Sequence, residues 1–299
     1  MSVPSRPLAP STAQDRPPSP VAVGCDGSPW GRAALFWAAD HASHTGSELD
    51  VWTWGEADDE VDDLTSGHPA LRVRLHRAGP DPVRDLEAAS LRAGTLVVGY
   101  QGRSTSPLGL DGLVLPLVEA AACDTVVVRG EASALRGTHQ RVTALVSGGE
   151  DDAQVLARAT AVLGGASVLR VVHAIPLHTA GDALVSEPQF VLDHAARLLD
   201  ELDPRPSYAT TLLRFHPHEA ITRYTDSDLL VVGSGDHHDL TGRCGSVTKA
   251  AVHHASCPVL VVRRPPSRIR PEASHHVPER PADGRPVPAD ARRSVRTSP

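Results

Sequence analysis

Glycine, serine and threonine crowd one short segment near the end of the chain, "GSGDHHDLTGRCGSVT" (233–248). Glycines let backbone N–H groups approach phosphate oxygens, and the start of a following helix adds free donors and the positive end of its dipole. Gly245 and Ser246 stand where "SVTKAAVHHA" begins a helical pattern. The Ser246 hydroxyl would therefore bond a phosphate or simply cap the helix, and the residues alone leave both interpretations open.

Val-rich strands and helical patterns must position this loop. The strands expected around it are 142–147, 167–174, 208–215, 228–234 and 258–263, and the helices expected between them are 151–163, 188–202, 217–225 and 246–255. Continuous apolar strands that alternate with helices predict a parallel sheet covered on both faces. In such a sheet, ligands bind beyond the carboxyl ends of the strands, which is where this loop follows its strand.

The same pattern occurs earlier in the chain. "VAVGCDGSPWGRAALFWAA" from Val21 matches "VTALVSGGEDDAQVLARATAVL" from Val142. The strands expected in this earlier copy are 21–26, 49–54, 71–76, 95–100 and 125–129. Its second and third strands are joined only by "GEADDEVDDLTSGHPA" (55–70), which is acidic and lacks an apolar stripe, so we expect no helix there.

The repeat predicts an α/β protein of two tandem, doubly wound, five-stranded parallel-sheet domains with disordered termini. The expected boundaries are a disordered tail (1–19), a short and degenerate first domain (20–130), a linker (131–140), a second domain (141–264) and a disordered Pro/Arg-rich tail (265–299). We call residues 20–130 half one and residues 141–264 half two.

Composition narrows the function. The chain has 299 residues and a formal net charge of −7, which argues against a nucleic-acid-binding surface. Its four cysteines are widely scattered, as is typical of reduced thiols in a cytosol that fill space as small buried side chains. We expect neither a secretory signal nor a membrane span, because no segment is long and apolar enough, and therefore predict a cytoplasmic protein.

Three segments, "VAVGCDGS", the "VVG" loops and "GSVTKAAVHHASCPVLVVRR", resemble the universal stress protein A (UspA) family, and the resemblance covers both halves. It implies domains like those of the adenine nucleotide alpha hydrolases and a role in stress response. Some members bind ATP through G-x2-G-x9-G-[S/T] and an Asp after strand one, and others bind none. Members pair through their fifth strands, which would join 125–129 to 258–263 within this chain. A dimer is also compatible with the resemblance.

The family motif is divided between the halves. Half one keeps the Asp and the glycine spacing but has Leu113 at the hydroxyl position. Half two keeps the Gly-Ser helix start, but its loop is one residue short, with Gly235 in place of the second glycine and Ser147 in place of the Asp. Half two is the better candidate for ATP, because it keeps the Gly-Ser helix start at the phosphate end of the motif. The residues that match the motif, and that the resemblance implies bind nucleotide, are Asp26, Gly99, Gly102, Gly112, Gly233, Gly235, Gly245, Ser246, Val247 and Thr248.

Three functions remain from the sequence. The first is a stress-response regulator that binds ATP, the second is an interaction scaffold of the same family that binds no nucleotide, and the third is a slow ATPase. We predict no enzyme, because neither a G-x4-G-K-[ST] loop nor a G-x-S-x-G elbow occurs.

Some of the remaining residues allow two interpretations each. Histidines at 216–219, 237–239 and 253–254 suggest a metal site or ordinary loop and helix positions, and we predict no metal. Asp26 would act as a general base or cap the following turn, and Trp54 would stack on a nucleobase or fill the core.

Overall fold

The computed structural model describes residues 18–54, 58–100, 114–164, 167–175, 186–202, 206–223, 226–235 and 244–264. Nearly all of the two predicted tails lies outside these ranges. In the described part of the chain, no helix is both long and apolar enough to cross a membrane.

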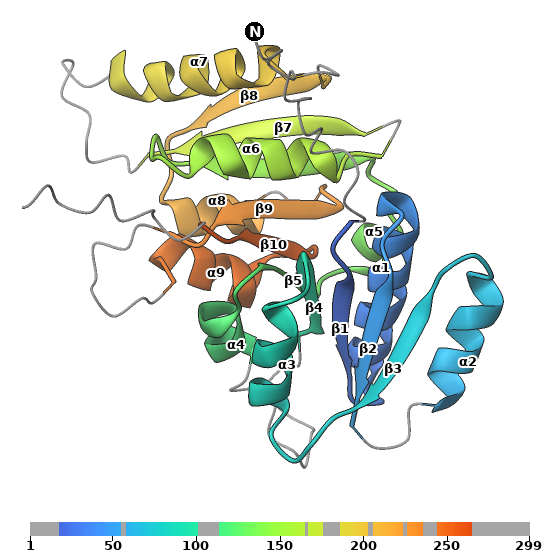
Figure 1. The fold of residues 1–299 in the computed structure, drawn as a ribbon. Coiled ribbons are helices and arrows are strands. Elements are labelled where there is room, and N and C mark those ends of the chain that lie inside the picture. Colours follow the sequence, from blue (N-terminus) through green and yellow to red (C-terminus); the bar gives the residue numbers. More distant parts are fainter. Residues whose placement is uncertain are drawn as a thin grey trace, which may run out of the picture. The chain divides into compact units, whose positions relative to one another are not determined.

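Strands and helices alternate through both halves (Figure 1). Half one contains β1 (Val21–Cys25), α1 (Pro29–Thr45), β2 (Leu49–Thr53), α2 (Asp58–Gly67), β3 (Val73–Arg77), α3 (Pro82–Ser90), β4 (Thr95–Gly99), α4 (Val114–Ala120) and β5 (Asp124–Val128). The short α5 (Ala132–Leu135) follows, within the predicted linker. Half two contains β6 (Arg141–Val146), α6 (Asp152–Ala161), β7 (Val168–Ala174), α7 (Ser186–Asp200), β8 (Tyr208–Leu213), α8 (Pro217–Arg223), β9 (Leu229–Gly233), α9 (Ser246–His254) and β10 (Val259–Val262).

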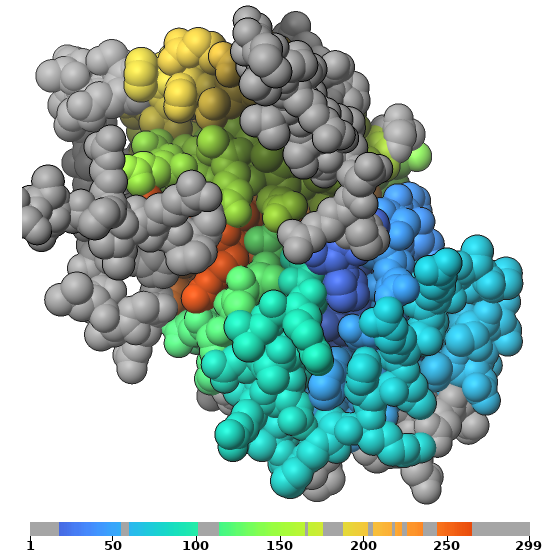
Figure 2. Space-filling view, in the orientation of Figure 1, coloured from blue at the N-terminus to red at the C-terminus, as the bar shows by residue number. Residues whose placement is uncertain are grey.

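The described strands form one ten-stranded sheet in the order β3-β2-β1-β4-β5-β10-β9-β6-β7-β8. Pairing is parallel within each half, which confirms two doubly wound, five-stranded α/β units. The halves meet where β5 runs antiparallel to β10, with Val127 opposite Val259 and Val126 opposite Leu260. Figure 2 shows the blue and cyan surface of half one adjoining the green and orange surface of half two.

Each face of the sheet carries an apolar layer that continues from one half into the other. Val126 of β5 and Leu260 of β10 belong to the layer beneath α1, α2, α6 and α7. Val127 and Val259 belong to the opposite layer, beneath α3, α4, α8 and α9. Because neighbouring residues of a strand point to opposite faces, one antiparallel pair of strands joins both cores.

A buried carboxylate closes the junction between the halves. Asp124 begins β5 and accepts the backbone N–H of Arg263 at 2.8 Å, and its other oxygen lies 2.7 Å from Nε of Arg158 on α6. Burial raises the pKa of Asp124, and these two partners oppose that rise.

Local sequence accounts for the start and end of α1. Ser28 is its N-cap and accepts the N–H of Gly31 at 3.0 Å, and Pro29 occupies the first turn, where its missing N–H costs no hydrogen bond. Gly46 ends the helix in the left-handed conformation, with φ 65°. Small residues such as Ala34 and Ala38 face the sheet, so the helix packs closely against it.

The prediction that half one lacks a helix between its second and third strands is wrong, because α2 occupies this position. Val61 is 8% exposed and Leu64 is fully buried. Two apolar residues three positions apart share one helix face, and here they suffice to bury α2 against the core. The surrounding acidic residues masked that short stripe in the sequence pattern.

Candidate functional site

A cavity of about 450 Å³ lies at the carboxyl ends of the half-two strands. Its size falls within the roughly 300–1,000 Å³ that is usual for small-molecule sites. All six of the half-two candidate residues line it, namely Gly233, Gly235, Gly245, Ser246, Val247 and Thr248. On the β6 and β7 side the wall includes Ser147, Asp152 and His173. The cavity therefore brings the glycine loop and the ends of three strands into one place.

Two glycines of the loop touch each other. Gly235 has φ +97°, and a Cβ placed on it would lie 2.6 Å from the backbone nitrogen of Gly245. The Gly245 N–H in turn donates to the carbonyl of Ser234 at 3.0 Å. Gly235 thus has two reasons to be glycine, a left-handed backbone and a close approach. It fulfils both although it is displaced by one residue from the family spacing.

The first turn of α9 faces this cavity without a side-chain cap. Gly245 is the N-cap and makes no capping hydrogen bond through a side chain, and no acidic residue lies in the first turn. Ser246 is therefore the first residue of the helix and not its cap, and it is exposed. The free N–H groups and dipole of this turn favour an anion.

Thr248 has a structural task. Its hydroxyl donates to the carbonyl of Gly233 at 2.8 Å, and the residue is 2% exposed. This bond ties the first turn of α9 to the end of β9. Thr248 therefore shapes the cavity wall, while Ser246 offers the hydroxyl that is free to meet a ligand.

Asp152 is a site residue that the sequence analysis missed. Its two carboxylate oxygens accept the backbone N–H groups of Ser147 at 3.0 Å and of Gly148 at 2.8 Å. Half two lacks an Asp at the end of its first strand, and a carboxylate from the start of α6 reaches the same turn instead. Burial raises the pKa of Asp152, whereas the two N–H bonds and nearby His173 lower it. The only hint in the sequence is the run of three acidic residues at 150–152 that follows the glycine turn.

Two further polar side chains, His173 and Asp151, line the cavity. His173 is 8% exposed, and its Nδ1 donates to the carbonyl of Val146 at 2.8 Å, which leaves Nε2 as the other polar atom of the ring. Asp151 also lines the cavity, and one of its oxygens lies 3.2 Å from Nε of Arg264. The described lining contains no lysine or arginine, so the positive character of the site comes from backbone dipoles.

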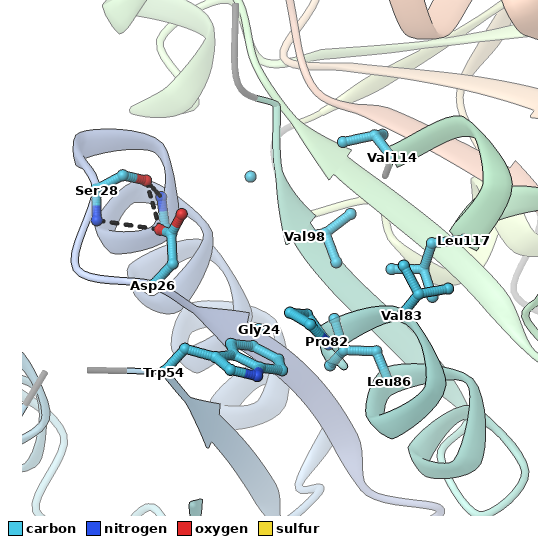
Figure 3. Close-up of a pocket in the computed structure, with 12 residues that line it drawn as sticks. Gly24, Asp26, Ser28, Trp54, Pro82, Val83, Leu86, Val98, Val114 and Leu117 are labelled. Carbon is cyan, nitrogen blue, oxygen red and sulfur yellow. Dashed lines mark hydrogen bonds between the residues drawn. The ribbon is translucent and has the colours of Figure 1, made fainter. Parts of the chain in front are cut away.

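The corresponding cavity of half one is much smaller, about 60 Å³. Figure 3 shows Trp54, Val83, Leu86, Val98 and Leu117 around it, with Asp26 and Ser28 at one end. This volume is far below that of an ordinary small-molecule site. The described residues of half one therefore enclose much less space than those of half two.

The half-one candidates serve the local fold. Asp26 accepts both the backbone N–H of Ser28, at 3.0 Å, and its hydroxyl, so it fixes the N-cap of α1 (Figure 3). A Cβ on Gly99 would lie 2.4 Å from the carbonyl oxygen of Trp30, so Gly99 allows β4 and α1 to touch. Gly102 and Gly112, with Leu113, lie outside the described residues.

The structure also locates Trp54 and several of the histidines for which the sequence allowed two interpretations. Trp54 lines the small half-one cavity, and its Nε1 donates to the carbonyl of Gly79 at 3.1 Å. His253 and His254 are exposed on α9, and positions 237–239 lie outside the described residues. Within the described ranges, no three His, Cys, Asp or Glu side chains gather as metal ligands would.

Comparison with known proteins first defines a class of fold. A universal stress protein of Archaeoglobus fulgidus DSM 4304 superposes with a TM-score of 0.58 at 16% identity, covering 82% of this chain and 96% of that one. Protein PA1789 of Pseudomonas aeruginosa PAO1 also gives a TM-score of 0.58, at 14% identity, with 83% and 93% coverage. The chain thus has the tandem α/β architecture of these proteins.

Sequence comparison finds similarity to one family. Residues 138–263 match the Universal stress protein family. Universal stress protein Rv2005c of Mycobacterium tuberculosis H37Rv is 28% identical over 82% of this chain and 97% of its own length, and Mb2028c of Mycobacterium bovis matches equally well. Residues 138–263 thus resemble a universal stress protein domain, and most of the chain is similar to a tandem protein of that name, as the motifs predicted.

Proposed function

We propose that this chain is a stress-response regulator that binds an adenine nucleotide, ATP, in the cavity of half two. The observation that carries the proposal is the uncapped first turn of α9, which opens onto a cavity of nucleotide size beside Gly235 and Gly245. Phosphate oxygens would accept the free N–H groups of this turn and the Ser246 hydroxyl. The ribose and the base would lie against the ends of β6 and β7.

The polar groups on the strand side suit a nucleoside. Nε2 of His173 would bond a ribose hydroxyl, because Nδ1 of the same ring is committed to Val146. Asp152 would hold the Ser147–Gly148 turn rather than bind the ligand, since both of its oxygens already accept N–H groups. Arg264 would offset the charge of Asp151 at the rim.

We further propose that the nucleotide is a regulatory ligand and is not turned over. The chain would act through its two halves, which pair with each other through β5 and β10. Binding would be weak, because the described lining supplies no cationic side chain to the phosphates.

That same lack of a cation in the described lining favours a second candidate, an interaction scaffold that binds no nucleotide. Two carboxylates, Asp151 and Asp152, lie in the wall and would repel a phosphate that came near them. In this case the continuous ten-stranded sheet would serve as a rigid platform for a partner.

Calorimetric titration with ATP separates the candidates. We expect wild-type protein to bind, Gly245→Asp to lose binding because a carboxylate enters the anion site, and Asp26→Ala in half one to bind as wild type does. Nucleotide released from the denatured protein would be identified by mass spectrometry. If wild-type protein fails to bind at millimolar ATP, the nucleotide proposal is wrong and the scaffold remains. Phosphate release that Gly245→Asp abolishes would instead indicate an ATPase.

A further inference from the structure

Half one touches the phosphate-loop side of the half-two cavity through one carboxylate. Glu119, on α4, accepts the backbone N–H of Cys244 through Oε1 at 3.2 Å. The same oxygen lies 3.8 Å from Nζ of Lys249. Cys244 directly precedes Gly245, the N-cap of α9, and Lys249 follows the first turn of that helix. One side chain therefore contacts both sides of the turn that faces the cavity.

Glu119 is itself held in place. Its carbonyl accepts a hydrogen bond from Nη1 of Arg263 at 2.9 Å, and the Arg263 N–H donates to buried Asp124 at 2.8 Å. Only 25% of the Glu119 side chain is exposed. The carboxylate is thus part of the junction between the halves and not a loose surface group.

Half one also holds the other end of α9. Arg129 follows β5, and its guanidinium donates to the carbonyl of Val252 in the last turn of the helix. The same guanidinium lies 4.2 Å from the centre of the Tyr100 ring. A cation at a helix C-terminus and an acceptor before its N-terminus both match the helix dipole and the unpaired backbone groups at its two ends.

We propose that Glu119 is a positioning residue for the anion site of half two. By accepting the Cys244 N–H and holding Lys249, it fixes Gly245 and the first turn of α9 in the geometry that directs their donors into the cavity. The proposal rests on the proposed function, and it gives half one, whose described cavity is much smaller, the task of supporting the site in half two.

The Glu119 carboxylate has two opposite effects on the affinity for an anionic ligand. Its hydrogen bond orders the donors, which strengthens binding, while its negative charge beside them weakens binding. Glu119→Gln keeps an acceptor oxygen and removes the charge, whereas Glu119→Ala removes both. The two substitutions therefore separate ordering from charge.

The first measurement is ATP affinity by calorimetry. We expect Glu119→Gln to bind as tightly as wild type or tighter, and Glu119→Ala to bind about tenfold more weakly, as for loss of one charged hydrogen bond. Glu87→Ala, which removes an exposed glutamate from α3 of half one, is the matched control and should leave affinity unchanged. Glu119→Gln that binds more than about threefold more weakly than wild type would overturn the proposal, even if Glu119→Ala does not fold.

The second measurement needs no nucleotide. Amide hydrogen exchange over residues 244–249 should be faster in Glu119→Ala, by about tenfold, and unchanged in Glu119→Gln. If wild-type protein does not bind ATP, the proposed function fails, yet exchange still reports whether Glu119 orders this turn. Equal exchange in wild type and a folded Glu119→Ala would show that it does not.

Discussion

The carboxylate of Asp152 accepts the backbone N–H of Ser147 at 3.0 Å, five residues back along the chain. Half one builds the corresponding turn with Asp26, which accepts the N–H of Ser28 two residues ahead. The two halves thus hold the loop between first strand and first helix with carboxylates from opposite sides of it. Half two has Ser147 where half one has Asp26, and the carboxylate of Asp152, five residues further along the chain, reaches the same turn instead.

Removing this carboxylate should destabilise the protein. Asp152→Ala leaves the N–H groups of Ser147 and Gly148 without their acceptor in a buried place, so we expect the free energy of unfolding to fall by about 1–3 kcal/mol. Chemical denaturation monitored by circular dichroism measures the change.

The neighbouring residue provides the control for Asp152. Asp151→Ala removes a carboxylate that forms an ion pair with Arg264 at 3.2 Å, and should cost no more than about 1 kcal/mol, as for a partly exposed ion pair. Equal losses in the two variants would show that the backbone bonds of Asp152 do not contribute specifically.

The sequence predicted most of the fold because its evidence is local. Val-rich strands, helix starts such as Ser28-Pro29 and the internal repeat each depend on neighbouring residues, and they predicted the ten strands correctly. The helix α2 was missed because only Val61 and Leu64 mark its buried face. Such a two-residue stripe does not stand out in a window of acidic residues.

The site was only partly predictable because its contacts are not local. The glycines of the loop follow from their types and spacing, whereas no periodic pattern indicates that Asp152 turns back toward Ser147. The contact of Glu119 with Cys244 joins residues 125 positions apart. Only the pairing of the two halves brings these residues together.

A second prediction distinguishes two glycines of the loop. Gly235→Ala forces a side chain into the left-handed region and places Cβ 2.6 Å from the nitrogen of Gly245, so the free energy of unfolding should fall by about 1–3 kcal/mol. ATP affinity should fall with it, because α9 begins at this contact. Thermal unfolding and calorimetry measure the two effects.

Gly233→Ala is the matched substitution for this test. A Cβ on Gly233 would meet its nearest atom, Cγ2 of Val155, at 3.5 Å, which is ordinary contact. We expect its melting temperature to stay close to that of wild type. A Gly235→Ala protein as stable as Gly233→Ala would mean that the close approach of Gly235 to Gly245 does not constrain the loop.

A third prediction concerns thiol chemistry. Burial raises the pKa of Cys123 and Cys257 to about 12, and burial together with Glu119 raises the pKa of Cys244 to about 11. The thiolate is the reactive form, so these cysteines should react slowly with a disulfide reagent at pH 8 in the folded protein and rapidly in guanidinium chloride. Rapid labelling of Cys244 in the native state would contradict the packing of Glu119 against it.

A fourth prediction concerns acid stability. Two hydrogen bonds from Arg170, at 2.8 and 2.9 Å, lower the pKa of Asp226 to about 2 from its ordinary 3.8. A depressed carboxyl pKa stabilises the fold above the unfolded pKa, and that stability disappears as pH falls from about 4 to 2. Asp226→Asn should therefore unfold more easily than wild type at pH 6, with the difference vanishing near pH 2.

The loss of stability in Asp226→Asn should be modest and weakened by salt, because half of the Asp226 side chain is exposed. Urea midpoints measured across this range, with Arg170→Gln as the background control, should show the difference shrink to the part that the second partner, Arg141, contributes. A difference that stays constant down to pH 2 would mean that Asp226 acts through packing and not through its charge.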